Sequence, residues 1–505
     1  MNKRRSGAIA SYLYTIGQMV VALIYVPLLL RGIGQSEYGL YQFAGSIMAY
    51  LTVMSTTLAM GVSRFYCKYY AEGDEDGMAN TLAIATKAAK WASVVTVVLG
   101  AVFMVVVRAV YAESFTAWEL NESCLLLGVL AINLMVMLSN TISIAVLTAH
   151  EEFVFYKLSC LVVLIMQPII VVLLMRWFPN ALLVCCVQLA MNFVLRMVQH
   201  TFAKRKLGMD TRLRYADDEL QRAILRFSGA IIMGVVADEI FWRTDQLILG
   251  YLYGTGTIAV YAVGAQICTT YMPLGTAVSS VFLPKVSRII TEEGCESALS
   301  DLFAKVGRVS LYPLLLVLTG FIVFGQDFIR LWAGEGFGEA YWVAVVIMIP
   351  FTIDIAQNTG NVILQALDKY YFRARLYLVA AVVNIGITCV LAVQFGCIGA
   401  AVATGVTLFI TSGIVMNWYY ARKIGLDIGL FWRECLKFTI APVVLCAIGA
   451  IAWHFLSASV EVGWLVLVVG ILVYTAVYAA VVIATANPYE RSLMRNVLSR
   501  FTKRA

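Results

Sequence analysis

The stretch Phe227–Tyr251, with the sequence FSGAIIMGVVADEIFWRTDQLILGY, decides how the rest of the chain is interpreted. It is long enough to cross a bilayer as a helix, since about 20 residues rising roughly 1.5 Å each span the hydrocarbon core. Its second half nevertheless carries four ionisable residues: Asp238, Glu239, Arg243 and Asp245. An ionisable group at membrane depth costs roughly 2.5–3.5 kcal/mol on insertion scales, so it normally faces a partner or a water-filled cavity.

Helical spacing sorts these four residues. Glu239 and Arg243 are i,i+4 neighbours with the acid on the N-terminal side, which is the favourable order for an ion pair. Asp238 and Asp245 lie with Trp242 on an adjoining stripe of the helix. Two interpretations stay open: a self-neutralising ion pair that helps helices pack, or a polar wall of a transport path.

Composition indicates a multi-span membrane protein. Of the 505 residues, 61% are hydrophobic and only 13% are charged, and apolar runs recur from end to end. The 11 cysteines show no C-x-x-C spacing and the three histidines are dispersed, so we predict no metal site and no cofactor. We predict an all-α fold with fourteen transmembrane helices at residues 8–31, 38–64, 82–109, 121–148, 153–176, 181–203, 227–251, 256–282, 307–331, 341–366, 372–394, 398–421, 435–456 and 463–485.

The positive charge of the chain is a topology signal. Most of the 37 Lys and Arg residues fall on the side of the predicted helices that the N-terminus shares, while Arg31, Arg108, Arg176 and Arg330 fall on the other. Because basic residues stay on the cytoplasmic side, we predict a multi-pass membrane protein with both termini in the cytoplasm. The net charge of +7 therefore does not indicate a nucleic-acid partner.

An internal repeat divides the predicted helices into two sets of six. The segments Leu147–Phe155 (LTAHEEFVF) and Leu364–Phe372 (LQALDKYYF) align 217 positions apart, and Gly39–Ala44 (GLYQFA) aligns with Ala259–Gly264 (AVYAVG) 220 apart. Both copies begin at the same membrane face, which predicts a parallel repeat about an axis along the membrane normal. We predict a six-helix lobe at 1–203, a basic cytoplasmic linker at 204–226, a second six-helix lobe at 227–423, two additional helices at 424–486 and a basic amphipathic cytoplasmic tail at 487–505.

Polar residues in the predicted span 341–366 form a second candidate site. Asp354, Asn358, Asn361 and Gln365 step by four, three and four residues, which places them on one helix face with Asp354 near the midplane. A carboxyl group at that depth is either protonated or paired, and amides there also serve interhelical hydrogen bonding. With Gln18 of the first span, these residues predict a wet cavity. No phosphate-binding loop occurs, so the chain does not power transport by its own ATP hydrolysis.

Several motifs resemble those of a transporter family. They are Leu30–Tyr41 (LRGIGQSEYGLY), Gly61–Tyr66 (GVSRFY), Arg243–Gly250 (RTDQLILG) and Leu364–Lys369 (LQALDK). In this order, over roughly residues 8 to 423, the chain resembles the Wzx-type polysaccharide-biosynthesis flippases of the multidrug/oligosaccharidyl-lipid/polysaccharide exporter superfamily. Fourteen spans also resemble the lipid II flippases, although the N-terminal motif does not look like theirs.

The resemblance implies a secondary transporter and not an enzyme. It implies two six-helix lobes that form a V around a cationic cavity and that work by alternating access. The implied substrate is an undecaprenyl-diphosphate-linked oligosaccharide, moved from the inner to the outer leaflet for surface, capsular or cell-wall glycan assembly. Its implied partners are this lipid-linked oligosaccharide, membrane lipids and a glycan polymerase, with the protein acting as a monomer.

The resemblance also assigns roles to the polar residues. Arg243 would attract the diphosphate, with Glu239 and Asp245 holding its side chain in the empty cavity. Arg64 would either meet the headgroup on entry or extend to the membrane interface. Asp354 would bind a coupling proton or sodium ion. The alternative is an ion-coupled multidrug exporter on the same scaffold, for which the acidic residues would line the pocket: Asp238, Glu239 and Asp354.

Overall fold

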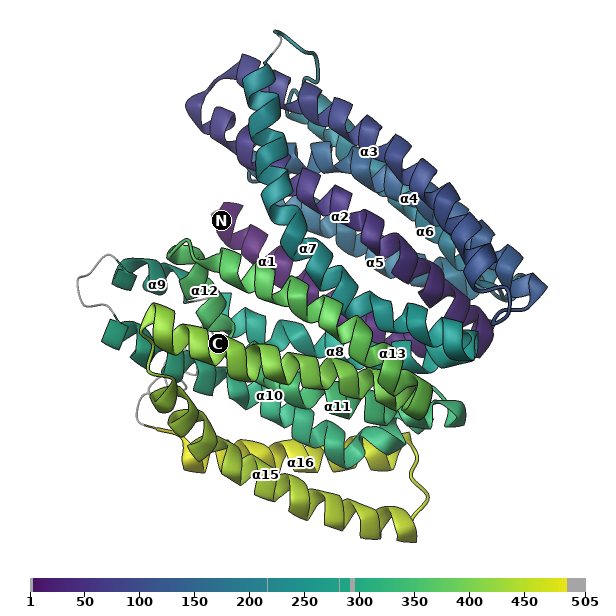
Figure 1. Cartoon of the computed structure of the whole chain (residues 1–505), viewed down its shortest axis with the longest axis vertical. Coiled ribbons are helices and arrows are strands. Elements are labelled where there is room, and N and C mark those ends of the chain that lie inside the picture. The colour runs from purple at the N-terminus through teal and green to yellow at the C-terminus, as the bar shows by residue number, and fades with distance from the viewer. Residues whose placement is uncertain (1–2, 216, 281, 291–295, 488–505) are drawn as a thin grey trace. The chain divides into compact units, whose positions relative to one another are not determined.

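The computed structural model describes residues 3–215, 217–280, 282–290 and 296–487, and these ranges are helical throughout apart from short connections (Figure 1). The first half holds α1 (Lys3–Ile33), α2 (Gln35–Glu72), α3 (Glu75–Val110), α4 (Ala117–Ala149), α5 (Phe153–Leu174), α6 (Ala181–Lys206), α7 (Asp218–Tyr253), α8 (Thr255–Ser280) and α9 (Leu283–Ile290). The second half holds α10 (Glu296–Trp332), η1 (Glu335–Phe337), α11 (Gly338–Ala356), α12 (Asn358–Ala366), α13 (Tyr370–Leu408), η2 (Phe409–Val415), α14 (Met416–Tyr419), η3 (Tyr420–Ile424), α15 (Ile428–Ser459) and α16 (Trp464–Thr485).

The predicted spans correspond to helical segments of the described residues, except that the span 341–366 is divided at Gln357 between α11 and α12. Eleven helical runs there are long and apolar enough to cross a membrane, and one of these, Tyr370–Ile424, contains two of the predicted spans. The helices α7 and α8, which correspond to the predicted spans 227–251 and 256–282, are not among the eleven. This long run is kinked at Gly396, which adopts φ 57° and ψ −135°. The all-α membrane fold is therefore confirmed, while the count of fourteen spans stays a prediction. The predicted tail helix falls after residue 487, outside the described residues.

The chain forms two compact units. Unit 1 comprises Met1–Ala262 with Tyr377–Gly396, and unit 2 comprises Val263–Leu376 with Cys397–Ala505. In unit 1, α7 packs against α2, and α4 packs against α2, α3 and α6. In unit 2, α10 packs against α11, α15 and α16. The domain boundaries inferred from the repeat stay a prediction, because they follow sequence correspondence and not packing.

Short polar side chains cap the N-termini of several helices. Asp74, Asn180, Asp217 and Asp427 each accept a hydrogen bond from the backbone N–H three residues later, at 2.8–2.9 Å. Thr116 forms a reciprocal capping box with the third residue of α4. Such caps satisfy amide groups that have no carbonyl partner in the first helical turn. They therefore fix where the long apolar runs start.

The backbone carries the internal repeat that the sequence predicts. Glu151 and Asp368, 217 positions apart, both adopt φ 56°, and they are the two non-glycine residues with positive φ among those described. In both copies the next residue donates its N–H to the carbonyl five residues earlier, at 2.9 and 2.8 Å. A left-handed residue other than glycine is uncommon. Its recurrence with the same hydrogen bonds indicates a common helix-ending turn.

Two pairs of glycines repeat in the same way. Gly34 and Gly254 have φ of 85° and 81° at the 220-residue spacing, and Gly208 and Gly425 have φ of 65° and 83° at the 217-residue spacing. These conformations favour glycine because a side chain there would be strained. Corresponding loops of the two halves therefore share a backbone conformation, although one glycine pair is 220 residues apart and the other 217.

A buried amide bridge also recurs, with its two residue types exchanged. Asn140 on α4 donates from Nδ2 to Oε1 of Gln199 on α6 at 2.9 Å. Gln357, 217 positions after Asn140, donates from Nε2 to Oδ1 of Asn417 on α14, also at 2.9 Å, and Asn417 lies 218 positions after Gln199. The glutamine is thus the second residue of the bridge in the first half and the first residue of the bridge in the second half, and the hydrogen bond has the same length in both. Buried amides need partners, so the exchange preserves the hydrogen bond.

The last two helices, α15 and α16, pack against α10 (Figure 1). Polar contacts join them as well. Arg308 on α10 is 4% exposed and donates to the carbonyl of Glu434 at 3.1 Å and to the carbonyl of Thr485, at the end of α16, at 3.2 Å. At another point of α10, Trp453 on α15 donates from Nε1 to Asp327 at 2.9 Å. A buried guanidinium with several acceptors therefore joins the ends of α15 and α16 to α10.

Replacing Arg308 by alanine should destabilise unit 2 by about 3 kcal/mol, because removal of one partner from a buried charged contact leaves the others unsatisfied. Thermal unfolding of the detergent-purified protein would measure the loss. Lys305→Ala is the matched control, since Lys305 is exposed and its contact with Asp301 at 3.3 Å is a surface ion pair. It should cost less than about 1 kcal/mol. Equal losses in the two variants would contradict this assignment.

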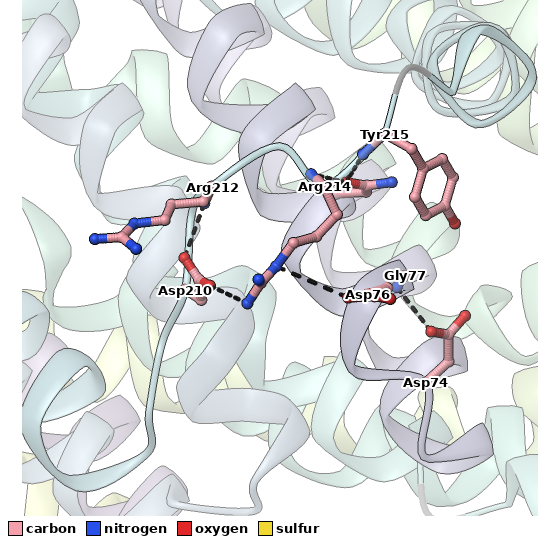
Figure 2. A network of polar contacts seen from close by, with 8 residues as sticks. Asp74, Asp76, Gly77, Asp210, Arg212, Arg214 and Tyr215 are labelled. Carbon is pink, nitrogen blue, oxygen red and sulfur yellow. Dashed lines mark hydrogen bonds and ion pairs between the residues drawn. The ribbon is translucent and has the colours of Figure 1, made fainter.

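The connection between α6 and α7 is attached to the start of α3 (Figure 2). Asn80 is fully buried and accepts the backbone N–H of Arg214 at 2.8 Å through Oδ1. The guanidinium of Arg214 contacts Asp210 at 2.8 Å and Asp76 at 3.8 Å. The exposed ion pairs contribute little on their own, whereas the buried amide fixes the backbone. The basic linker is therefore held at one defined point.

Asn80→Ala should free this connection, because the backbone N–H of Arg214 loses its acceptor. Hydrogen–deuterium exchange should rise by about tenfold at the amides of Arg214 and Tyr215, corresponding to roughly 1.4 kcal/mol. Arg212→Ala is the control, since Arg212 contributes its backbone N–H to the network, which the substitution keeps. Unchanged exchange in Asn80→Ala would refute the attachment.

Candidate functional site

The charged helix α7 is fastened to α2 by side-chain hydrogen bonds. Tyr50 and Thr244 share a hydrogen bond of 2.7 Å, and Ser46 donates to Gln246. Nearer the start of α7, Ser228 donates to the carbonyl of Thr57 at 3.2 Å. These contacts turn one polar face of α7 toward α2. They therefore determine which of its ionisable groups stay accessible.

Arg243 and Glu239 form the ion pair that their spacing predicts. Nε of Arg243 lies 3.6 Å from Oε2 of Glu239, which is an ion pair but beyond ordinary hydrogen-bonding distance. The Arg243 side chain is 40% exposed and that of Glu239 is 24% exposed. Asp238, the residue before Glu239, is exposed. The Arg243 side chain is thus partly accessible, while its Nε atom is buried and has no hydrogen-bond partner among the described residues.

Asp245 has a different environment from its neighbours on α7. It is 1% exposed, and it accepts hydrogen bonds from the hydroxyl of Tyr261 on α8 and from that of Thr388 on α13, the latter at 3.0 Å. Two hydroxyl donors stabilise a buried carboxylate that would otherwise be costly. The expected role of Asp245 as a holder of Arg243 stays a prediction, and the structure adds a second function in joining α7, α8 and α13.

Arg64 and Gln18 lie on other helices of unit 1. The exposed guanidinium of Arg64 on α2 stacks over the ring of Phe227 on α7, 4.3 Å from its centroid. Gln18 on α1 is exposed and donates to the hydroxyl of Tyr14 at 3.2 Å, and Lys157 lies over the same tyrosine ring. Both residues are accessible, and their expected roles toward a substrate stay predictions.

In unit 2, Asp354 is one half of an ion pair. Its Oδ1 lies 3.7 Å from the guanidinium of Arg373 and accepts a hydrogen bond of 2.7 Å from Ser412. The side chains of Asp354 and Arg373 are 18% and 17% exposed. Of the two states that the sequence leaves open, protonated or paired, the geometry fits the paired one. Ser412 belongs to the π-helical segment η2, and such segments are frequent at functional sites.

The expectation of one continuous helix from Asp354 through the three amides needs a correction. The helix is interrupted at Gln357, so Asp354 lies in the last turn of α11 while Asn358 and Asn361 belong to α12. The backbone here makes a tighter turn, with the N–H of Gly360 bonded to the carbonyl of Gln357 at 2.8 Å. Asn361 donates to Asn358 at 2.9 Å, so these two amides are brought together. The physical reason is the turn, where the side chain of Gln357 bonds across to α14.

Sequence reasoning missed three residues of these sites. The sequence pattern places Tyr261 only within the repeated segment Ala259–Gly264, includes Arg373 only among the basic residues on the cytoplasmic side, and gives Thr388 no role. A polar residue inside an apolar run is a signal that could have identified Thr388 in the predicted span 372–394, whereas Arg373 lies at the very start of that span. Among the described residues, no group of three or more His, Cys, Asp or Glu side chains is arranged to hold a metal ion.

Comparison with known proteins places the chain in a family. Residues 5–290, which are more than half of the chain, match the model of the polysaccharide biosynthesis protein family. The chain belongs to this family. The matched residues include α1 to α9, and therefore both Arg243 and Asp245.

A curated relative and two solved structures extend the comparison. The protein named probable low-salt glycan biosynthesis flippase Agl15, from Haloferax volcanii, is 22% identical over 223 residues, covering 42% of this chain and 44% of that protein. The match thus spans less than half the length of that relative. The structure of the lipid II flippase MurJ in an inward closed conformation has a TM-score of 0.74 at 15% identity, covering 97% of this chain and 99% of that one. An inward-facing multidrug resistance MATE family transporter of the MOP superfamily has a TM-score of 0.58 at 12% identity, covering 81% and 98%. At these identities the structural likeness shows a shared fold.

Tyr261→Phe should destabilise unit 1 by about 1–3 kcal/mol, because the buried carboxylate of Asp245 loses a hydroxyl donor. Thermal unfolding of the purified protein would measure this loss. Tyr253→Phe removes a hydroxyl that donates to the carbonyl of Ala392 at 3.0 Å from a half-exposed ring, so it should cost less. If both variants unfold at the same temperature as the parent protein, the hydroxyl of Tyr261 does not stabilise Asp245.

Proposed function

We propose that the protein is a flippase for a polyprenyl-diphosphate-linked oligosaccharide. It moves this lipid from the inner to the outer leaflet of the bacterial cytoplasmic membrane by alternating access, for surface, capsular or cell-wall glycan assembly. Membership of the polysaccharide biosynthesis family supports the proposal. Further support comes from two similar proteins that are named as flippases, one in glycan biosynthesis and one for lipid II. The protein works as a monomer, with a glycan polymerase as the next enzyme along the route.

The observation that carries the proposal is the state of Arg243. A guanidinium at membrane depth is costly unless it serves a partner or an aqueous path. Arg243 is 40% exposed and its carboxylate partner Glu239 is 3.6 Å away. A diphosphate offers two anionic groups with the geometry that a guanidinium binds bidentately. It would therefore replace the loosely held carboxylate, and Glu239 would take Arg243 back after release.

Asp354 is the candidate coupling residue. Its contact with Arg373 at 3.7 Å means that a proton or a sodium ion would have to displace the guanidinium. Protonation of Asp354 would remove the attraction and release Arg373, so one ion would change the local charge and the local contacts together. The π-helical turn beside it, which contains Ser412, could change its hydrogen bonding at small cost.

An ion-coupled multidrug exporter is the second candidate function. The fold is similar to that of a multidrug resistance transporter. Asp238 is exposed beside Glu239, and two acidic residues would attract a cationic drug. The charge of Arg243 opposes this function, because a cationic drug would be repelled at the same place.

Arg243→Ala should reduce flipping of the lipid-linked oligosaccharide at least tenfold, because the diphosphate loses its charged partner. The assay would follow a fluorescent polyprenyl-diphosphate oligosaccharide in proteoliposomes that contain the whole chain. Arg243→Lys should retain part of the rate, since the charge stays while the bidentate geometry is lost. Arg375→Ala is the control, because Arg375 is exposed and stacks on Tyr371 at 4.2 Å.

Two results would overturn the functional assignment. One is a normal rate in both Arg243→Ala and Asp354→Asn at equal protein level. The other is transport of a lipophilic cation by the parent protein with no movement of the lipid-linked glycan, which would identify an exporter. If Asp354→Asn flips normally while Arg243→Ala does not, the substrate proposal holds and the coupling proposal fails.

A further inference from the structure

An open pocket of about 460 Å³ lies between α5 and α6 of unit 1. Phe155 of α5 and Met197 and Phe202 of α6 form its wall, and Arg205 and Lys206 lie at one end. It involves none of the residues assigned above to the substrate or the coupling ion. Its lining combines an apolar surface with positive charge at the terminus of a membrane helix.

The apolar wall of the pocket is built by stacked rings. The centroids of Phe155 and Phe202 are 3.9 Å apart with an interplanar angle of 16°. Met197 and Val198, one helical turn before Phe202, are about half exposed, so the pocket continues into the apolar outer surface of α6. A hydrocarbon chain lying along this wall would be in contact with protein instead of with other lipids.

The charged end of the pocket has no internal counter-charge. Arg205 and Lys206 are exposed in the last turn of α6, and neither forms an ion pair with an acidic residue in the described part of the chain. Basic residues in a last helical turn are also favoured by the helix dipole, which accounts for their position but leaves their charge available to a ligand. Basic pockets between helices on the positively charged side of a membrane protein bind anionic lipid headgroups.

The same arrangement recurs in unit 2. Phe372 and Tyr419, 217 positions after Phe155 and Phe202, stack with centroids 3.8 Å apart at an interplanar angle of 4°. Arg422 and Lys423 follow at the same spacing from Arg205 and Lys206, and both are exposed. The stacked rings and the adjacent cations have thus been kept together in both halves of the repeat. Packing accounts for the rings, and the membrane orientation accounts for basic residues on this side, but neither requires that two exposed cations lie directly beside the rings in both halves.

We propose that the pocket between α5 and α6 binds one anionic phospholipid of the leaflet that faces the basic ends of the helices. Arg205 and Lys206 bind the phosphate of the headgroup, and one acyl chain lies against the stacked rings of Phe155 and Phe202. The site selects for net negative headgroups, because a zwitterionic lipid carries a compensating cation. The ligand is a bilayer lipid and not the transported glycan.

Photocrosslinking tests the proposal on the whole chain in nanodiscs of phosphatidylcholine. A photoreactive phosphatidylglycerol is titrated in, and the labelled peptides of α5 and α6 are quantified by mass spectrometry. The double variant Arg205→Ala/Lys206→Ala should shift half-maximal labelling to about 30-fold more lipid, since each basic residue near an anionic membrane surface contributes roughly a factor of five. Phe202→Ala should lower labelling by both phosphatidylglycerol and photoreactive phosphatidylcholine, because the acyl chain loses its wall.

Lys87→Ala/Lys90→Ala is the matched control, since it removes the same charge from exposed positions on α3. It should leave labelling of α5 and α6 within about twofold of the parent protein. The proposal is overturned if this control weakens labelling as much as the α6 double variant, which would indicate diffuse attraction. It is also overturned if inorganic phosphate or undecaprenyl phosphate displaces the probe at equal concentration. Normal glycan flipping by the α6 double variant would leave the proposed transport function intact.

Discussion

The structure depends on one constraint: ionisable groups at membrane depth must have partners, and the partners determine what each group can do. Asp245 accepts two hydroxyl hydrogen bonds in a buried site, and this fixes it as a junction between helices. Asp354 is paired with Arg373 yet partly exposed. Arg243 is paired with Glu239 at 3.6 Å, and its side chain is 40% exposed, whereas that of Arg373 is 17% exposed. The cost of desolvation thus distinguishes the buried carboxylate of Asp245 from the partly exposed, ion-paired side chains of Asp354 and Arg243, for which coupling and substrate binding are proposed.

Features encoded by nearby residues could be predicted from the sequence. The pairing of Glu239 with Arg243 needs only four residues of helix, and the helical segments need only apolar length. The repeat could be detected in the sequence because corresponding loops in the two halves have the same length. Glu151 and Asp368, which share a positive φ, are an example. In each case the physical cause lies within one short window of the chain.

Features that join distant segments could not be predicted. Thr388 lies 143 positions from Asp245, and one sequence contains no information about which apolar helices are neighbours. The sequence does not single out Arg373 as a partner of Asp354, because a basic residue at the cytoplasmic end of a helix is already explained by membrane orientation. The turn at Gln357 could not be predicted, because the polar residues on both sides of it keep the spacing of one continuous helix. In all three cases the observed arrangement depends on tertiary hydrogen bonding and not on local propensity.

The contact of Arg308 with the ends of α15 and α16 has a consequence for how the number of helices can change. Arg308 belongs to α10, within the repeated part of the chain, but its acceptors at Glu434 and Thr485 belong to the additional pair. Deleting the pair would remove the acceptors at Glu434 and Thr485 from a guanidinium that is 4% exposed. Truncation before residue 428 is therefore expected to destabilise the remaining chain. A shorter descendant would first need an uncharged residue at position 308. The order of such evolutionary changes is constrained by one side chain.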